Sequence, residues 1–228
     1  IEKINNYGFT NVHMRNWANP EMLEKIDVSS VQTPHETYHD ARIIYCKFDA
    51  LEWAVLEKGN SLFIDSDIIL VDEIDKNISG KNTDAILSPH YYGDPNRRQL
   101  SLDWGAFNAG YLFASKPEVA SAWRRIYLGD SKFYEQEGMR LLFNEFDCYV
   151  FNRCHNFGFW RFEYTNVFDK ASRTNTLSIP YKFDLNFVKS FHIRLQEYDF
   201  KDPYIKKRFY VFYNAVKNYI PEDIRSFQ

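Results

Sequence analysis

Residues 62–71 read Leu-Phe-Ile-Asp-Ser-Asp-Ile-Ile-Leu-Val, two apolar runs separated by a short acidic segment. A short apolar run bounded by turn residues is typical of a strand buried on both faces. The run at 61–64 therefore predicts a buried strand that ends at Asp65, and the run at 68–71 predicts another. Because ligands of open α/β sheets bind beyond the carboxyl ends of strands, we expect the acidic segment to lie at a functional edge.

The segments on either side of this stretch alternate between helix and strand patterns. Upstream, apolar residues recur at three- and four-residue steps over 39–58, which predicts an amphipathic helix that ends at Gly59. Further on we expect strands at 84–88, 106–115 and 187–195, helices at 117–128, 134–145 and 202–219, a helical turn at 72–77 and a loop at 90–103. This order predicts an α/β fold with a mostly parallel sheet flanked by helices. We expect one domain over 1–200 and a C-terminal helix over 201–228 packed on it.

Composition and charge narrow the functional classes. The 228 residues include 20 Phe and 16 Tyr and carry a net charge of −3, so we expect an aromatic-rich folded domain without the basic surface that nucleic-acid binding needs. No apolar run approaches the roughly 20 residues of a membrane span. Cys46, Cys148 and Cys154 match neither a disulfide framework nor a zinc site, which favours a reducing, cytoplasmic location. The apolar face of helix 202–219 leaves core packing, a homodimer contact and a membrane surface open.

Asp65 and Asp67 are the candidate metal ligands. In an extended segment, residues two apart point to the same side, so one hard cation can bridge the two carboxylates. Oxygen ligands suit Mn²⁺ or Mg²⁺, and a cation would relieve the repulsion between two carboxylates at the end of an apolar strand. Alternatively, Asp67 caps a turn and Asp65 is solvated, because an isolated Asp-x-Asp is common.

A second polar interruption follows in residues 104–114, which read Trp-Gly-Ala-Phe-Asn-Ala-Gly-Tyr-Leu-Phe-Ala. The strand-like aromatic pattern breaks at Asn108, Ala109 and Gly110. Gly110 lets a ligand or a backbone approach closely, and the Asn108 amide offers both a donor and an acceptor to a sugar hydroxyl. A β-bulge with a satisfied amide is the alternative.

The order of these segments resembles the GT-A nucleotide-diphospho-sugar glycosyltransferases, above all the glycogenin-like and galactosyltransferase-like branch. The resemblance rests on Lys-Phe-Asp-Ala-Leu-Glu-Trp-Ala-Val-Leu at 47–56, Phe-Ile-Asp-Ser-Asp-Ile-Ile-Leu at 63–70 and Phe-Asn-Ala-Gly-Tyr-Leu-Phe at 107–113, and covers about 40–145. It implies a GT-A-type, Rossmann-like sheet that is mixed but mostly parallel. It also implies a metal-dependent glycosyltransferase that moves a sugar from a UDP- or GDP-type donor to a hydroxyl of a carbohydrate, protein or lipid-linked acceptor.

The resemblance assigns three sets of residues. The expected metal ligands, for Mn²⁺ or Mg²⁺ against the donor diphosphate, are Asp65, Asp67 and His192. The expected donor-binding residues, which contact the nucleotide, its phosphates or the donor sugar, are Lys47, Arg42, Ser66, Asn108, Ala109, Gly110 and Arg194. The expected catalytic residues, at the reacting sugar carbon, are Glu135, Gln136 and Asp103. An inverting enzyme would use such an acid as the base for the acceptor hydroxyl, and a retaining one would use it for electrostatic support.

The sequence departs from the family pattern in two places. The family has an acidic residue followed by Gln at a helix start, usually Asp-Gln, where this chain has Glu135 and Gln136. First-turn acidity favoured by the helix dipole is the alternative for Glu135, and a structural histidine is the alternative for His192. The family's first strand and nucleotide-binding loop normally precede a helix like the one expected at 2–9, so we expect further sequence upstream.

Two other functions compete with glycosyl transfer. A haloacid-dehalogenase-type phosphohydrolase also places Asp-x-Asp after an apolar strand, with the first Asp as nucleophile and the second as general acid. That motif usually lies near the start of the domain, and no later acidic pair in this chain continues it properly. The other alternative is a non-catalytic carbohydrate- or partner-binding module with a degenerate site.

Overall fold

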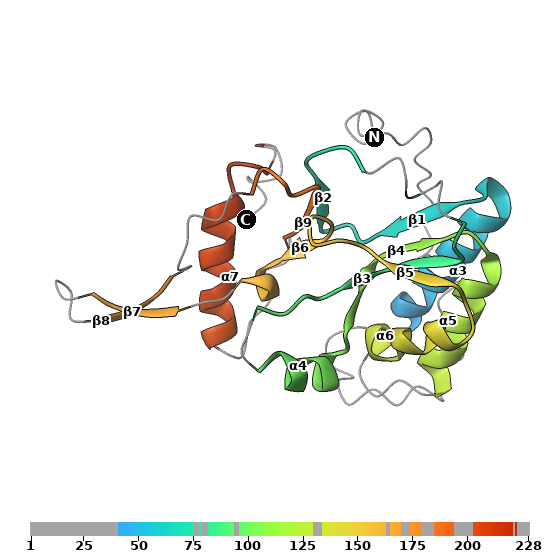
Figure 1. The fold of residues 1–228 in the computed structure, drawn as a ribbon, viewed down its shortest axis with the longest axis horizontal. Coiled ribbons are helices and arrows are strands. Elements are labelled where there is room, and N and C mark those ends of the chain that lie inside the picture. Colours follow the sequence, from blue (N-terminus) through green and yellow to red (C-terminus); the bar gives the residue numbers. More distant parts are fainter. Residues whose placement is uncertain are drawn as a thin grey trace. The chain divides into compact units, whose positions relative to one another are not determined.

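The computed structural model describes residues 41–74, 78, 82–93, 96–129, 134–162, 165–169, 174–178, 185–193, 203–220 and 222. Contacts group the chain into two compact units. Figure 1 labels the helices and strands described below. Unit 1 comprises Ile1–Asp65, Ile74–Pro89 and Arg98–Phe151, and unit 2 comprises Ser66–Glu73, His90–Arg97 and Asn152–Gln228. The Asp65-Ser66-Asp67 segment therefore crosses from unit 1 to unit 2, with Asp65 in the first and Asp67 in the second.

Unit 1 is built on a four-stranded sheet with the strand order β1-β4-β3-β5. The strands are β1 (Ser61–Ile64), β3 (Ala85–Pro89), β4 (Phe107–Ala114) and β5 (Cys148–Val150). β4 runs antiparallel to both β1 and β3, whereas β3 and β5 are parallel. The fold is thus α/β as predicted, but the described strands do not form a mostly parallel sheet. Buried strands have similar apolar composition in either direction when both faces are covered, so the sequence pattern does not fix direction.

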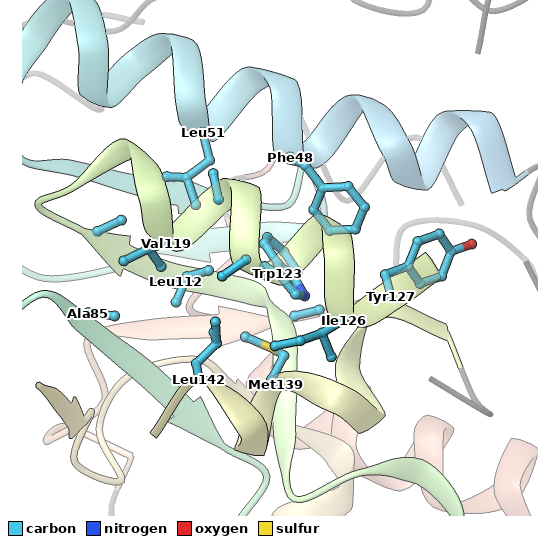
Figure 2. Packing of buried hydrophobic residues seen from close by; sticks show 14 of the residues in the cluster. Phe48, Leu51, Ala85, Leu112, Val119, Trp123, Ile126, Tyr127, Met139 and Leu142 are labelled. Atoms are coloured by element: carbon cyan, nitrogen blue, oxygen red, sulfur yellow. The ribbon is translucent and has the colours of Figure 1, made fainter. Parts of the chain in front are cut away.

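The core of unit 1 lies between this sheet and its helices. α3 (Ala41–Lys58) packs along α5 (Pro117–Gly129), and Figure 2 shows Phe48 and Leu51 of α3 facing Trp123 and its neighbours on α5. The rings of Phe48 and Trp123 meet edge to face with centroids 4.7 Å apart. α6 (Tyr134–Glu137) continues directly into the 3-10 helix η1 (Gly138–Asn144), which adds Met139 and Leu142 to the core.

Unit 2 has a smaller, three-stranded sheet in the order β2-β9-β6. β2 (Ile68–Leu70) pairs antiparallel with β9 (Ser190–His192), which pairs in parallel with β6 (Phe157–Gly158). The 3-10 helix η2 (Phe159–Arg161) follows β6, and β7 (Thr165–Asp169) pairs antiparallel with β8 (Thr174–Ser178). α7 (Pro203–Val216) buries Phe212 and Val216 in the same core as the β2 and β9 side chains. Core packing therefore accounts for Phe209, Phe212 and Val216, whereas Tyr204 and Tyr219 of the predicted apolar face are exposed.

The sequence predicted α3, α5 and α7 and the strands β1 to β4 and β9, but not η2 or the strands β5 to β8. Three further segments differ from their predicted structure. Residues 90–103, predicted as a loop, include α4 (Arg97–Trp104). The helix predicted at 134–145 is α-helical only over its first four residues and 3-10 beyond them. The turn predicted at 72–77 is not helical over 72–74, and 75–77 lie outside the described residues. No helix in the described part of the chain is long and apolar enough to cross a membrane. The three cysteines, which all lie within that part, form no disulfide.

Candidate functional site

The Lys47 ammonium joins two carboxylates in unit 1. Its Nζ lies 3.1 Å from both Oδ1 and Oδ2 of Asp65 and 2.7 Å from Oε1 of Glu135. Lys47 comes from α3, Asp65 follows β1, and Glu135 lies on α6, so one cation ties three separate elements together. Glu135 is only 7% exposed, and two carboxylates held this close need a positive charge between them.

The environment of Lys47 keeps its side chain charged. Burial by itself lowers the pKa of the ammonium, but attraction to Asp65 and Glu135 outweighs burial and raises the pKa above its ordinary value. Glu135 is also fixed through its main chain, because the indole Nε1–H of Trp123 donates to the Glu135 carbonyl over 2.7 Å. Glu135 is therefore held through its main chain by Trp123 and through its carboxylate by Lys47.

A bulge in β4 makes room for the Asp65 carboxylate. The β3–β4 register runs from Leu87 opposite Leu112 to Ser88 opposite Asn108, so three residues of β4 have no partner on β3. Within the bulge, Gly110 N–H donates to the Asn108 Oδ1 over 3.0 Å, and Asp65 N–H donates to the Gly110 carbonyl over 2.9 Å. A Cβ on Gly110 would lie 2.6 Å from Asp65 Oδ2, so only glycine leaves space for this carboxylate. The bulge alternative for Asn108 is therefore confirmed, and its amide supports the loop beside Asp65.

A second polar cluster lies in unit 2. The β2–β9 register places Ile68 opposite His192, and the Ile193 N–H donates to the Asp67 carbonyl over 2.9 Å. The Nε2 of His192 lies 3.3 Å from Oδ1 of Asp67, and its Nδ1 lies 3.0 Å from Oδ1 of Asn156. The structure therefore brings together Asp67 and His192, which are far apart in sequence and were both predicted as metal ligands.

The chemistry of this pair fits a divalent cation. In the neutral tautomer with a hydrogen on Nδ1, His192 donates to Asn156 Oδ1 and presents the lone pair of Nε2 towards Asp67. This is the arrangement of a metal-ligating histidine whose other ring nitrogen is fixed by a polar neighbour. Adjacent ligands around Mg²⁺ lie about 3 Å apart when its bonds are about 2.1 Å long. Among the described residues, no group of three or more His, Cys, Asp or Glu is arranged to hold a metal, so Asp67 and His192 supply two ligands.

The remaining predicted residues fall into two groups. Ser66 is exposed, Ala109 is buried in β4, and Gln136 is half-buried on α6, where its carbonyl lies 3.0 Å from the Cβ position of Gly105. Arg42 and Asp103 lie on α3 and α4, but their side chains are not described, and Arg194 lies outside the described residues. Their predicted roles stay predictions.

Neither Asn156 nor Trp160 was predicted as a site residue from the sequence. Both lie in the aromatic stretch after residue 152, which carries no recognised motif. Asn156 has a left-handed backbone with φ of 53°, a conformation that Asn adopts more readily than most residues. Trp160 contacts the His192 ring edge to face, with centroids 5.1 Å apart.

Comparisons with known proteins returned no match: no family model, no curated protein and no solved structure is similar to this chain.

Proposed function

We propose that this protein is a metal-dependent glycosyltransferase that takes a sugar from a nucleoside-diphosphate donor. The observation that carries the proposal is the pairing of Asp67 with His192 across β2 and β9, at 3.3 Å. The GT-A resemblance assigns both residues to one metal site. An Asp-x-Asp motif whose second aspartate contacts a histidine from a distant strand is a more specific indication of such a metal site than the motif alone.

Asp67 and His192 would hold Mn²⁺ or Mg²⁺. Asp65, the third ligand that the resemblance implies, contacts the Lys47 ammonium in unit 1 and stays a prediction. A bound cation would neutralise the negative charge that develops on the leaving diphosphate.

The resemblance places Glu135 on the sugar side of the proposed reaction, and Asn108 supports the bulge beside Asp65. The bond between the anomeric carbon and the diphosphate oxygen breaks, a bond to the acceptor oxygen forms, and the acceptor proton passes to a base. The anomeric carbon becomes positive as the first bond breaks. A carboxylate that accepts a hydrogen bond from the Lys47 ammonium is better suited to electrostatic support of that charge than to proton abstraction, so we assign Glu135 the former role.

Titration of the full-length protein with UDP and with GDP, each with and without Mn²⁺, tests this proposal by calorimetry. We expect one of the nucleotides to bind only with the metal, and Asp67→Ala to abolish that dependence. The matched control is Asp72→Asn, which removes an exposed carboxylate of the same segment that pairs with Lys189 at 2.6 Å. Metal-independent binding, or equal metal dependence in Asp67→Ala, would contradict the proposal. Phosphatase activity lost in Asp65→Asn would instead support the phosphohydrolase.

A further inference from the structure

Gly158 leaves the space in which the Trp160 indole lies, next to the His192 ring of the Asp67–His192 pair. The parallel β6–β9 register places Gly158 opposite His192. A Cβ on Gly158 would lie 2.3 to 2.5 Å from Cη2, Cζ3 and Cζ2 of Trp160, so the six-membered ring of the indole lies directly over this glycine. The Gly93 N–H also donates to the Trp160 carbonyl over 3.0 Å. The position of the indole is therefore built into the sheet and its flanking loop.

Rings surround the Trp160 side chain. The His192 ring meets it edge to face, and the His90 ring does the same with centroids 5.5 Å apart. Trp160 is 8% exposed, and within the described residues its Nε1–H has no hydrogen-bond acceptor. A buried donor without an acceptor is destabilising, and most buried tryptophans donate their N–H to a partner. A fixed, buried and unsatisfied donor next to a candidate metal ligand points to an acceptor that arrives with a ligand.

We propose that the Trp160 indole N–H donates a hydrogen bond to a phosphate oxygen of the nucleoside diphosphate bound by Asp67 and His192. This inference rests on the proposed function and deepens it. A nucleoside diphosphate held through a metal on Asp67 and His192 would bring phosphate oxygens close to the His192 ring, which the Trp160 ring contacts. An anionic oxygen is also the stronger acceptor, because hydrogen bonds to charged groups are shorter and about twice as strong as neutral ones. Trp160 is thus a binding residue that the Asp-x-Asp motif does not include.

The test removes the N–H while keeping the ring. In the full-length protein, Trp160 is replaced by 3-benzothienylalanine, which has sulfur in place of the N–H, and separately by Phe. UDP and GDP affinities are measured by calorimetry with Mg²⁺, and thermal unfolding is followed without ligand. We expect the benzothienyl variant to bind the preferred nucleotide at least about 10-fold more weakly, the loss typical of a hydrogen bond to a charged group, with no fall in melting temperature. The control is Trp104→Phe, at a tryptophan that is 40% exposed in unit 1.

An NMR measurement tests the same hydrogen bond in the unaltered protein. The five tryptophans give five indole N–H signals in an ¹⁵N spectrum, and the Trp160 signal is expected to move downfield when UDP or GDP binds with Mg²⁺. A nucleotide affinity unchanged in the benzothienyl variant, or a Trp160 signal that does not move in the bound protein, would overturn the inference and leave the proposed function standing. If the unaltered protein binds neither nucleotide with a metal, the proposed function fails, and the inference fails with it.

Discussion

Lys47 illustrates, at the scale of one residue, how charge fixes a candidate site. The family resemblance predicts that this residue contacts the nucleotide or its phosphates. In the structure, its ammonium forms ion pairs with Asp65 and Glu135. A helix pattern places Lys47 before the Asp-x-Asp strand, but its partner on α6 is 88 positions away. Only the folded chain reveals that pairing. The donor-contact role stays a prediction, and the role in organising the two carboxylates follows from the distances.

We expect Lys47→Met to lower the free energy of unfolding by about 3 kcal/mol, because it leaves two carboxylates close together without their cation. Chemical denaturation at neutral pH measures the change. Lys116→Met is the control: it removes an exposed lysine that pairs with Asp84 at 2.7 Å, and its effect should be much smaller. Equal losses in the two variants would show that Lys47 does not bind the carboxylates in the way described.

Gly110 is the second residue whose identity the site requires. Gly110→Ala should lower the free energy of unfolding by about 1–3 kcal/mol, since the new methyl group would displace the Asp65 carboxylate. Gly129→Ala is the control, because nothing lies within 4 Å of the Cβ position there. Thermal unfolding of both variants checks the prediction. A Gly110→Ala protein as stable as Gly129→Ala would mean that Asp65 moves aside at no cost.

At the scale of elements, the α3–α5 pair holds unit 1 together. Phe48 is fully buried against Trp123, so Phe48→Ala should lower the free energy of unfolding by about 3–5 kcal/mol. Leu56→Ala on the same helix, at a side chain that is 66% exposed, should change it by less than about 0.5 kcal/mol. Urea denaturation of the two variants gives the comparison. Similar losses of unfolding free energy in the two variants would contradict the burial of Phe48 against Trp123.

The elements also show what local sequence patterns determine. The apolar stripe over 39–58 predicted α3, whose described part starts at Ala41, and Pro117 marked the start of α5 correctly. Strand direction was missed, because β4 returns antiparallel beside β3 and no local pattern encodes that choice. α4 was missed because the polar residues of 90–103 resemble a loop and the helix has no apolar stripe of its own.

At the scale of the whole molecule, the predicted metal motif divides between two units. Asp65 belongs to the Lys47 cluster of unit 1, and Asp67 belongs to the His192 cluster of unit 2. The family resemblance predicted site roles for Asp65, Asp67, Glu135 and His192, and the structure places Asp65 and Glu135 in the first cluster and Asp67 and His192 in the second. The sequence missed Asn156 and Trp160, because their roles depend on β6 pairing with β9, a contact between segments more than thirty residues apart. Long-range pairing of this kind is decided by the whole fold rather than by a local motif.

Donor turnover tests the central claim most directly. The full-length protein is incubated with a panel of UDP- and GDP-sugars with and without Mn²⁺, and release of the nucleoside diphosphate is measured. We predict metal-dependent release from at least one donor, and loss of that release in Asp67→Asn but not in the Asp72→Asn control. Absence of release from every donor, or release that Asp67→Asn leaves intact, would contradict the assignment of this chain as a metal-dependent glycosyltransferase.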